Sequence, residues 1–313
     1  MTGGGIVARK GAMNILITGI SGQLGNRLSE ILTERGINHR GISRSLDYKT
    51  DVPHLCKDLL EIDNEELAEF IKPVTHVIHL ADVISESRDF ERDLEKQFKN
   101  CCLGTIKLLN CLHSNIEHFS FASSYSVYGS PRELPITEQT VLHPENVYSF
   151  CKLSTENYLT LFRSMNNIPM AILRIASIYG PGPKKENYSR SVPNMIETVL
   201  GGDPPYVCGE GATFRDYMYI DDCINATINA SMLKADGIFN IASGVGTTIK
   251  ELAENIIQIS GIQCVLEHRY DAELEWDSVC DIGKMKTGLE YEPKFSIRDG
   301  LKLTYEWHKK NRQ

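Results

Sequence analysis

Three glycines stand between a short apolar run and a helical pattern near the start of the chain. The run Asn14-Ile-Leu-Ile-Thr18 predicts a buried strand, and residues 26–35 have a helical periodicity that stops at Gly36. Between them lies Gly19-Ile-Ser-Gly22-Gln-Leu-Gly25. Glycines in a strand-to-helix turn permit a tight bend and let a pyrophosphate approach the positive end of the helix. The order therefore favours a dinucleotide site, although glycines at such a turn can also be purely structural.

Apolar strands alternate with helical patterns over the first half of the chain. We expect a second strand that ends near Ile42-Ser43, and further strands over residues 75–80, 119–123 and 170–174. Helical patterns cover residues 65–71, 91–113 and 146–165. This alternation predicts an α/β fold with a Rossmann-type, doubly wound parallel sheet.

The pattern changes after Arg174, where turn-rich segments begin. Helical patterns near 191–200, 221–233 and 248–259 follow, with short strands between them. We expect residues 1–12 to be a flexible leader and residues 13–175 to form mainly the dinucleotide-binding domain. Residues 176–313 are predicted to form mainly a smaller, mixed α/β substrate-binding lobe, with some strands and helices returning to the first domain.

Composition excludes several kinds of partner. A formal charge of −8 argues against nucleic acid, which usually requires a basic face. No apolar run approaches the roughly 20 residues that span a bilayer, and the first residues lack the apolar core of a secretory signal, so a cytoplasmic protein is expected. Nine cysteines without a CxxC pair and nine histidines without HExxH spacing predict reduced thiols and no metal.

Tyr148 and Lys152 are four residues apart in a predicted helix, so their side chains share one face. A phenol with a pKa of about 10 is a poor base at neutral pH, but a neighbouring ammonium favours the phenolate. Ser124 could hydrogen-bond the same substrate oxygen, or could simply cap a loop at the end of its strand. The pair is not diagnostic alone, because Tyr305 and Lys309 repeat the spacing near the C-terminus.

Four motifs in order resemble one enzyme family. They are Thr18-Gly-Ile-Ser-Gly-Gln-Leu-Gly25, Ser123-Ser-Tyr-Ser-Val-Tyr-Gly129, Tyr148-x-x-x-Lys152 and Arg215-Asp-Tyr-Met-Tyr-Ile-Asp-Asp222. The chain thereby resembles the extended short-chain dehydrogenase/reductases, the group of NAD(P)-dependent nucleotide-sugar epimerases, dehydratases and reductases. The likeness runs from about Met13 to about Trp307 and is more specific than any one motif.

The resemblance implies a mechanism. NAD(P)⁺ takes a hydride from a sugar carbon, usually C4, and the tyrosine accepts the hydroxyl proton. By this likeness Tyr148 is the general base and Ser124 orients the substrate hydroxyl. Lys152 lowers the pKa of the tyrosine and binds the nicotinamide ribose.

The resemblance also assigns a cofactor-binding set. NAD enzymes of this type usually carry an acidic residue at the end of the second strand, where this chain has Ser43 followed by Arg44. A guanidinium there suits a 2′-phosphate and favours NADP over NAD, unless Arg44 is only a solvated loop residue. Asp82 replaces a residue that is usually small. The full set is Gly19, Ser21, Gly22, Gln23, Leu24, Gly25, Ser43, Arg44, Asp58, Leu59, Leu80, Ala81, Asp82, Asn100, Tyr148, Lys152 and Ile175.

The expected substrate is a nucleotide-diphosphate sugar. By the resemblance, Arg215 contacts the diphosphate, although a salt bridge of Arg215 to Asp216 or Asp221 is an alternative. Ser177 stands where many relatives have an asparagine near the diphosphate, and Arg269 could supply a second charge. Together with Ser124 and Val192 these residues form the predicted substrate-binding set, which leaves the sugar and the base open.

Among the activities of the family, a 4-epimerase is the first expectation. Tyr125 and Ser126 occupy the positions of the acidic pair of 4,6-dehydratases and cannot serve as that pair, so a dehydratase is disfavoured. An NADPH-dependent 4-keto-sugar reductase is the alternative, and a non-catalytic dinucleotide-binding protein would need neither Tyr148 nor Lys152. Family members often pair two long helices across a four-helix interface, so a homodimer is expected.

Overall fold

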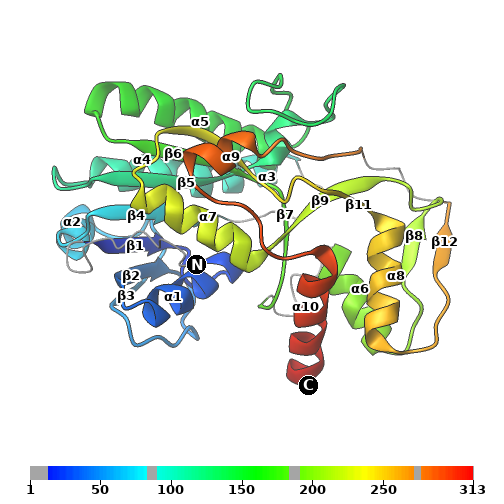
Figure 1. Cartoon of the computed structure of the whole chain (residues 1–313). Coiled ribbons are helices and arrows are strands. Elements are labelled where there is room, and N and C mark those ends of the chain that lie inside the picture. The colour runs from blue at the N-terminus through cyan, green and yellow to red at the C-terminus, as the bar shows by residue number, and fades with distance from the viewer. Residues whose placement is uncertain (1–12, 83–89, 183–190, 271–275, 313) are drawn as a thin grey trace, which may run out of the picture. The chain divides into compact units, whose positions relative to one another are not determined.

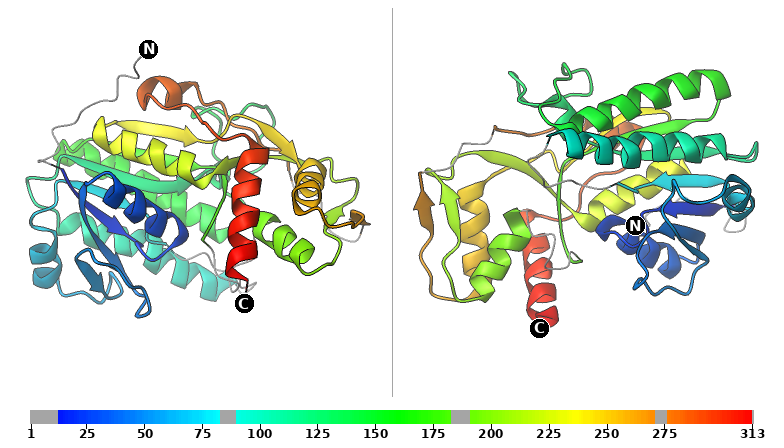
Figure 2. Two further views of the ribbon diagram at one scale, coloured as in Figure 1. Left: turned by 60° about the horizontal axis from the view of Figure 1, so that its bottom comes forward. Right: turned by 180° about the vertical axis from the view of Figure 1, so that it is seen from behind.

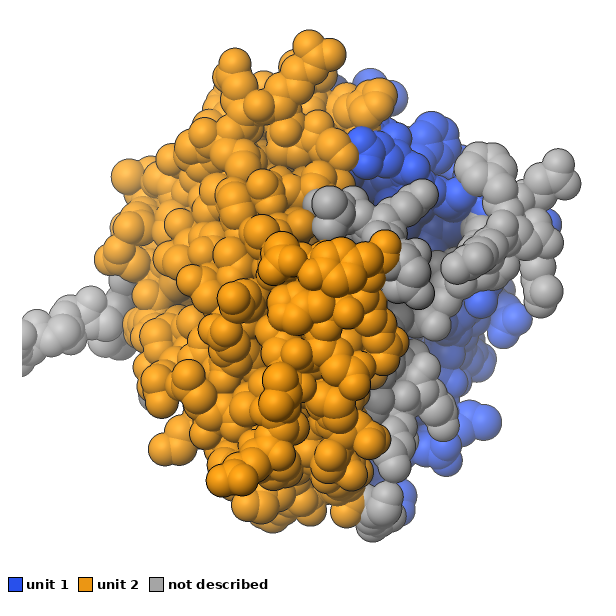
Figure 3. Space-filling view, turned by 90° about the vertical axis from the view of Figure 1, so that its right-hand side faces the viewer, with its two compact units in different colours: residues 1–127, 144–173, 227–239 blue, residues 128–143, 174–226, 240–313 orange. Residues whose placement is uncertain are grey.

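A computed structural model of the chain describes residues 13–82, 90–182, 191–270 and 276–312 (Figure 1). The predicted leader, residues 1–12, lies outside them. The chain forms two compact units, which Figure 3 colours separately. Unit 1 consists of residues 1–127, 144–173 and 227–239, and unit 2 of residues 128–143, 174–226 and 240–313.

A seven-stranded sheet in the order β10-β6-β5-β4-β1-β2-β3 is the framework of unit 1. The strands are β1 (Asn14–Thr18), β2 (Asn38–Ser43), β3 (His54–Cys56), β4 (His76–His79), β5 (His118–Ser124), β6 (Met170–Ile175) and β10 (Gly237–Ile241). Parallel registers join β3 to β2, β2 to β1, β1 to β4 and β4 to β5. Because the strand order reverses between β1 and β4, this is the doubly wound arrangement, and the predicted α/β fold is confirmed.

Helices connect these strands. They are α1 (Gln23–Glu34), α2 (Asn64–Ile71), α3 (Phe90–Phe98), the π-helical turn η1 (Lys99–Leu103), α4 (Gly104–Asn110) and α5 (Val147–Asn166), with a short 3₁₀ turn η2 (Tyr125–Tyr128) after β5. The long helix predicted over 91–113 is therefore interrupted by a π turn and ends three residues early. Figures 1 and 2 show α3 and η1 side by side with α5.

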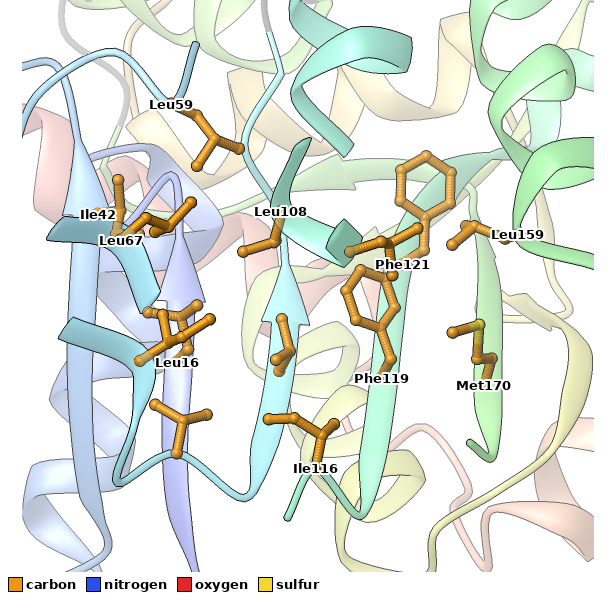
Figure 4. Close-up of a cluster of buried hydrophobic side chains, with 14 of the residues drawn as sticks. Leu16, Ile42, Leu59, Leu67, Leu108, Ile116, Phe119, Phe121, Leu159 and Met170 are labelled. Atoms are coloured by element: carbon orange, nitrogen blue, oxygen red, sulfur yellow. The ribbon is translucent and has the colours of Figure 1, made fainter. Parts of the chain in front are cut away.

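A hydrophobic core of unit 1 lies between the sheet and helices α2, η1, α4 and α5 (Figure 4). Leu16, Phe119 and Phe121 contribute to it from the strands, and Leu108 and Leu159 from the helices. Side chains alternate along a strand, so the equally buried neighbours of Leu16 point to the other face, which α1 covers. Because side chains are buried on both faces of the sheet, the strands are held firmly, and so are the polar residues at their ends.

Unit 2 contains two small sheets and a group of packed helices. One sheet has the order β11-β9-β7, formed by β7 (Ser177–Tyr179), β9 (Phe214–Tyr219) and β11 (Gly246–Thr248), and the other pairs β8 (Tyr206–Cys208) with β12 (Glu267–Arg269). Helices α6 (Ser191–Leu200), α8 (Ile249–Ser260) and α10 (Ile297–Asn311) pack on one another, and α9 (Gly283–Gly288) is short. Helix α7 (Ile220–Met232) begins in unit 2 and ends in unit 1.

Candidate active site

The glycine turn after β1 leaves no room for side chains at two of its positions. Gly19 has a φ of 73°, and a Cβ there would lie 2.9 Å from the backbone of Ala81. A Cβ on Gly25 would lie 2.2 Å from the carbonyl oxygen of Gly19. Helix α1 begins directly after Gly22, with neither a side-chain cap nor an acidic residue in its first turn. An uncapped helix start of this kind suits an anionic group such as a pyrophosphate.

A chain of hydrogen bonds ties this turn to the end of β4. Thr105 donates to the carbonyl of Cys101 (2.5 Å), so its oxygen can accept a hydrogen from Nε2 of His79 (2.8 Å). The Nδ1 atom of His79 then accepts from Thr18 (2.5 Å), whose oxygen accepts from the N–H of Ala81 (3.2 Å). Every bond in this chain is consistent with a neutral imidazole. Burial, aided by the charge of Lys152, accordingly lowers the pKa of His79 to about 3.

The first turn of α5 places Tyr148 and Lys152. Asn146 caps the helix: its side chain accepts from the N–H of Ser149 (2.9 Å), and the Ser149 hydroxyl accepts in return from the N–H of Asn146 (3.3 Å). Tyr148 is the second residue of the helix, and Lys152 follows one turn later. The Lys152 ammonium lies 5.6 Å from the centre of the Tyr148 ring. The predicted shared helix face is present.

Lys152 is held on three sides. Its ammonium donates to the carbonyl of Ala122 at the end of β5 (2.6 Å), pairs with the carboxylate of Asp82 (2.8 Å) and lies 4.8 Å from the centre of the Phe121 ring. The side chain is only 4% exposed. Burial has the largest single effect on the pKa of Lys152 and would lower it. The charge of Asp82, together with smaller contributions from Tyr148 and Cys101, raises this pKa overall, so Lys152 is an ammonium.

Ser124 adjoins the Tyr148 hydroxyl, and Ser126 adjoins Ser124. Ser126 donates to the oxygen of Ser124 through both its hydroxyl (2.9 Å) and its N–H (3.2 Å). The hydroxyl hydrogen of Ser124 is thereby directed away from Ser126, and Ser124 hydrogen-bonds Tyr148 in the sense that stabilises a phenolate. Burial nevertheless raises the pKa of Tyr148; Lys152 and Ser124 oppose this rise, and Asp82 adds to it. The sequence analysis considered Ser126 only as a replacement for a dehydratase acid, and did not predict its contact with Ser124.

Three predicted cofactor residues from different segments lie together beyond the end of β2. The Arg44 guanidinium is 3.3 Å from the carboxylate of Asp58 and 3.3 Å from the side-chain oxygen of Asn100. Arg44 is about half exposed, with 51% of its side chain accessible. Ser43, buried at the strand end, hydrogen-bonds His54 (2.9 Å). Arg44 is thus held in this cluster by specific polar contacts.

The remaining predicted substrate residues belong to unit 2, whereas Ser124 belongs to unit 1. The guanidinium of Arg215, on β9, is 5.9 Å from the ring of Trp276. That of Arg269, on β12, stacks 3.8 Å from the ring of Tyr206 and is 3.4 Å from Glu267. Ser177 pairs with Tyr217 in the β7–β9 register, and Val192 is buried on α6.

Two aspartates of the Arg215 motif, Asp216 and Asp222, tether loops. Asp216 is fully buried and accepts from the backbone of Ser243, Gly244 and Cys280 and from the Ser243 hydroxyl, at 2.6–3.2 Å. Asp222 accepts from Tyr291 (2.6 Å) and from two backbone N–H groups at 3.0 Å. These bonds hold the segments after β10 and α9 in place.

Two negative findings concern the described part of the chain. Within it, no group of three or more His, Cys, Asp or Glu side chains is arranged to hold a metal ion. No helix among those residues is both long and apolar enough to cross a membrane. All nine cysteines are free thiols.

Comparison with known proteins places the chain in a family. A family model described as the NAD dependent epimerase/dehydratase family matches residues 15–242. The chain belongs to this family. It is therefore an enzyme of NAD-dependent nucleotide-sugar chemistry, and the resemblance read from its four motifs is confirmed.

Individual relatives differ in the reaction that they carry out. The chain is 28% identical to a putative UDP-glucose 4-epimerase of Methanocaldococcus jannaschii, over 95% of this chain and 99% of that protein. It is equally 28% identical to a UDP-N-acetyl-alpha-D-glucosaminuronate decarboxylase of Bacillus cytotoxicus, over 93% and 96%.

Solved structures agree in fold. A Thermotoga maritima UDP-glucose 4-epimerase with UDP-glucose superposes with a TM-score of 0.87 at 27% identity, covering 96% of this chain and all of that one. A Bacillus cereus UDP-glucuronic acid 4-epimerase in complex with UDP-glucuronic acid and NAD gives 0.83 at 26% identity, covering 95% and 99%.

Proposed function

We propose that this enzyme is an NAD-dependent 4-epimerase of a nucleotide-diphosphate sugar. The observation that carries the proposal is the group of Ser124, Tyr148 and Lys152, in which one hydroxyl donor and one ammonium lie beside a single phenol. Such a phenol can exchange one proton with a sugar hydroxyl. UDP is the nucleotide we propose, because the similar epimerases are described with UDP-sugars.

The glycine turn fits a bound dinucleotide, because both close approaches would be lost with any side chain at Gly19 or Gly25. We assign the pyrophosphate to this turn and to the start of α1. The adenosine end is assigned to the cluster of Arg44, Asp58 and Asn100, and the nicotinamide ribose to Lys152. We propose that the other residues of the predicted cofactor-binding set contact the same dinucleotide.

The chemistry that NAD supplies when bound is acceptance of a hydride from the sugar C4 and its return to the opposite face. Tyr148, as the phenolate, takes the proton of the C4 hydroxyl while the C4–H bond breaks, which leaves a 4-keto sugar. Tyr148 gives the proton back when the carbonyl is reduced, so one residue both accepts and returns the proton. Ser124 donates to the same oxygen, and Arg215 and Arg269 are assigned to the diphosphate.

An NADPH-dependent 4-keto-sugar reductase is the second candidate. The observation in its favour is the end of β2, which carries Ser43 and Arg44 instead of an acidic residue. The NADP preference inferred from these residues stays a prediction, because a bond to a 2′-phosphate would have to compete with the Asp58 contact of Arg44.

One experiment separates the two candidates. The purified protein is denatured and the released dinucleotide is identified by mass and absorbance. A 4-epimerase must retain its nicotinamide through oxidation and reduction, so stoichiometric NAD is expected, followed by C4 inversion of a UDP-sugar observed by NMR. Protein that releases no dinucleotide, binds NADPH more tightly than NADH and reduces 4-keto sugar nucleotides would replace the epimerase by the reductase.

The catalytic assignment has a matched control within the chain. Tyr148→Phe should abolish inversion and leave dinucleotide binding intact. Tyr305→Phe changes the other tyrosine with a lysine four residues later, which is buried in α10, and should leave the rate within about twofold of wild type. Inversion retained by Tyr148→Phe would contradict the mechanism.

We further propose that the enzyme is a homodimer built on α5 and its neighbours. Large apolar side chains on these helices are exposed: Phe98, Leu103, Phe150, Leu161 and Met165, the last to 74%. Leu161→Glu should give a monomer in light scattering at micromolar concentration, whereas Val265→Glu, at another exposed apolar residue, should not. A wild-type protein that is monomeric under these conditions would contradict the assignment. The cytoplasmic location stays a prediction from the sequence.

A further inference from the structure

Asp82 follows β4 directly and reaches the centre of the candidate active site. One carboxylate oxygen is 2.8 Å from the ammonium of Lys152, and the other accepts a hydrogen bond from the side-chain amide of Gln97 (2.7 Å). The Asp82 side chain is only 11% exposed, and Gln97 is 1% exposed. Gln97 thus fixes the orientation of the carboxylate toward the lysine.

The charge of Asp82 changes what Lys152 can do for Tyr148. An ammonium alone beside a phenol favours the phenolate, but an ammonium paired with a carboxylate presents almost no net charge. The same pairing occupies one of the three N–H donors of Lys152, and the Ala122 carbonyl occupies a second. Lys152 is therefore fixed in position, and Asp82 reduces its effect on the phenol.

The other titratable groups around Tyr148 do not restore that charge. Among the described residues that interact electrostatically with Tyr148, Cys101 on η1 is a buried thiol whose pKa is raised by its contact with Cys102 and by burial, so it is neutral. His79 at the end of β4 faces Lys152 and is also neutral. Among the residues that the structure describes, Lys152 and Asp82 are thus the charged groups that act on the phenol.

We propose that Asp82, oriented by Gln97, is a positioning residue that clamps Lys152 against the Ala122 carbonyl and weakens the positive charge that Lys152 presents to Tyr148. The phenolate is then less favoured than it would be beside an unpaired ammonium. Oxidation of the sugar hydroxyl, which requires the phenolate, becomes the step that depends on pH. This inference rests on the proposed role of Tyr148 and adds Asp82 and Gln97 to its control.

The test measures the phenol directly and needs no turnover. Protein labelled with ¹³C at the tyrosine Cζ is titrated by NMR, and the Tyr148 resonance is identified by its absence in Tyr148→Phe. In Asp82→Asn the carboxylate charge is lost, and at a fixed alkaline pH we expect about tenfold more Tyr148 phenolate than in wild type. Asp82→Ala introduces the small side chain usual at this position and should change the phenolate fraction in the same direction if Asp82→Asn does not fold.

Glu95→Gln is the matched control, because it removes the α3 carboxylate of the exposed Lys99–Glu95 pair, two residues from Gln97. It should leave the Tyr148 resonance unchanged. An Asp82 variant that folds, loses thermal stability and titrates at Tyr148 like wild type would overturn the proposal and leave Asp82 as a structural ion pair. If no UDP-sugar is inverted by the wild type, the proposed function fails, while the titration still decides the role of Asp82.

Discussion

His79 makes the stability of the enzyme depend on pH below neutrality. The imidazole lies inside the hydrogen-bond chain from Thr105 to Thr18, where burial lowers its pKa from 6.5 to about 3. The unfolded chain binds a proton at this histidine as the pH falls below about 6.5, and the folded chain does not until about pH 3. Stability from this residue is therefore complete above pH 6.5 and declines continuously toward pH 3.

The size of the effect follows from linkage. Each pH unit within that window changes the free energy of unfolding by about 1.4 kcal/mol, so acidification from about pH 7 to about pH 5 should remove about 2 kcal/mol through His79 alone. Burial also lowers the pKa of His118, to about 4, so this residue should remove a similar amount over the same interval. The losses through His79 and His118 together amount to a large part of the free energy of unfolding of a typical domain.

Urea unfolding followed by circular dichroism at both pH values measures the loss. His79→Gln keeps an uncharged polar side chain and removes the titratable group. It should be less stable than wild type at pH 7, but its pH-dependent loss should be smaller by about 2 kcal/mol. His143→Gln, at an exposed histidine, controls for the removal of a histidine as such. Equal pH-dependent losses in wild type and His79→Gln would refute the conclusion that His79 is neutral in the folded chain.

Three further substitutions test the framework of the site. Gly25→Ala places a Cβ 2.2 Å from a backbone oxygen, so it should cost about 2 kcal/mol in thermal unfolding and weaken NAD binding, measured by calorimetry, by at least about tenfold. Asp216→Asn removes one acceptor from a fully buried carboxylate that receives four hydrogen bonds; a loss of about 2 kcal/mol is expected in urea unfolding. Thr248→Ala deletes the capping box at the start of α8 and should lower the free energy of unfolding by about 1 kcal/mol, whereas Thr248→Ser should keep it. Identical melting temperatures for the wild type and both variants would contradict the capping role.

The local features of the fold and the site could be predicted from the sequence because neighbouring residues determine them. Gly25 is required by a contact within one turn and Gly19 by its φ of 73°, and the spacing of Tyr148 and Lys152 is a property of one helix. Residues 54–56 were not predicted as a strand, because they form a three-residue edge strand without an apolar run. The pairing of β3 with β2 comes from the sheet and not from local preference.

The Arg215 motif could be recognised in the sequence, but the contacts of its aspartates could not be predicted from it. Asp216 follows Arg215 directly and was one alternative partner for it. Side chains alternate along β9, and the Asp216 carboxylate is surrounded by backbone N–H groups that come from residues more than 25 positions away. No spacing rule could have identified these partners.

Asp82 is the clearest case in which tertiary structure changes the meaning of a motif. The sequence showed a carboxylate where a small residue is usual, but the lysine that it pairs with is 70 positions later and on another element. Only the parallel pairing of β4 with β5, and the packing of α5 on β5, bring the two charges to 2.8 Å. The Tyr-x-x-x-Lys motif specifies that an ammonium will be near a phenol. Whether that ammonium acts as a net positive charge depends on a third residue, and here Asp82 opposes it.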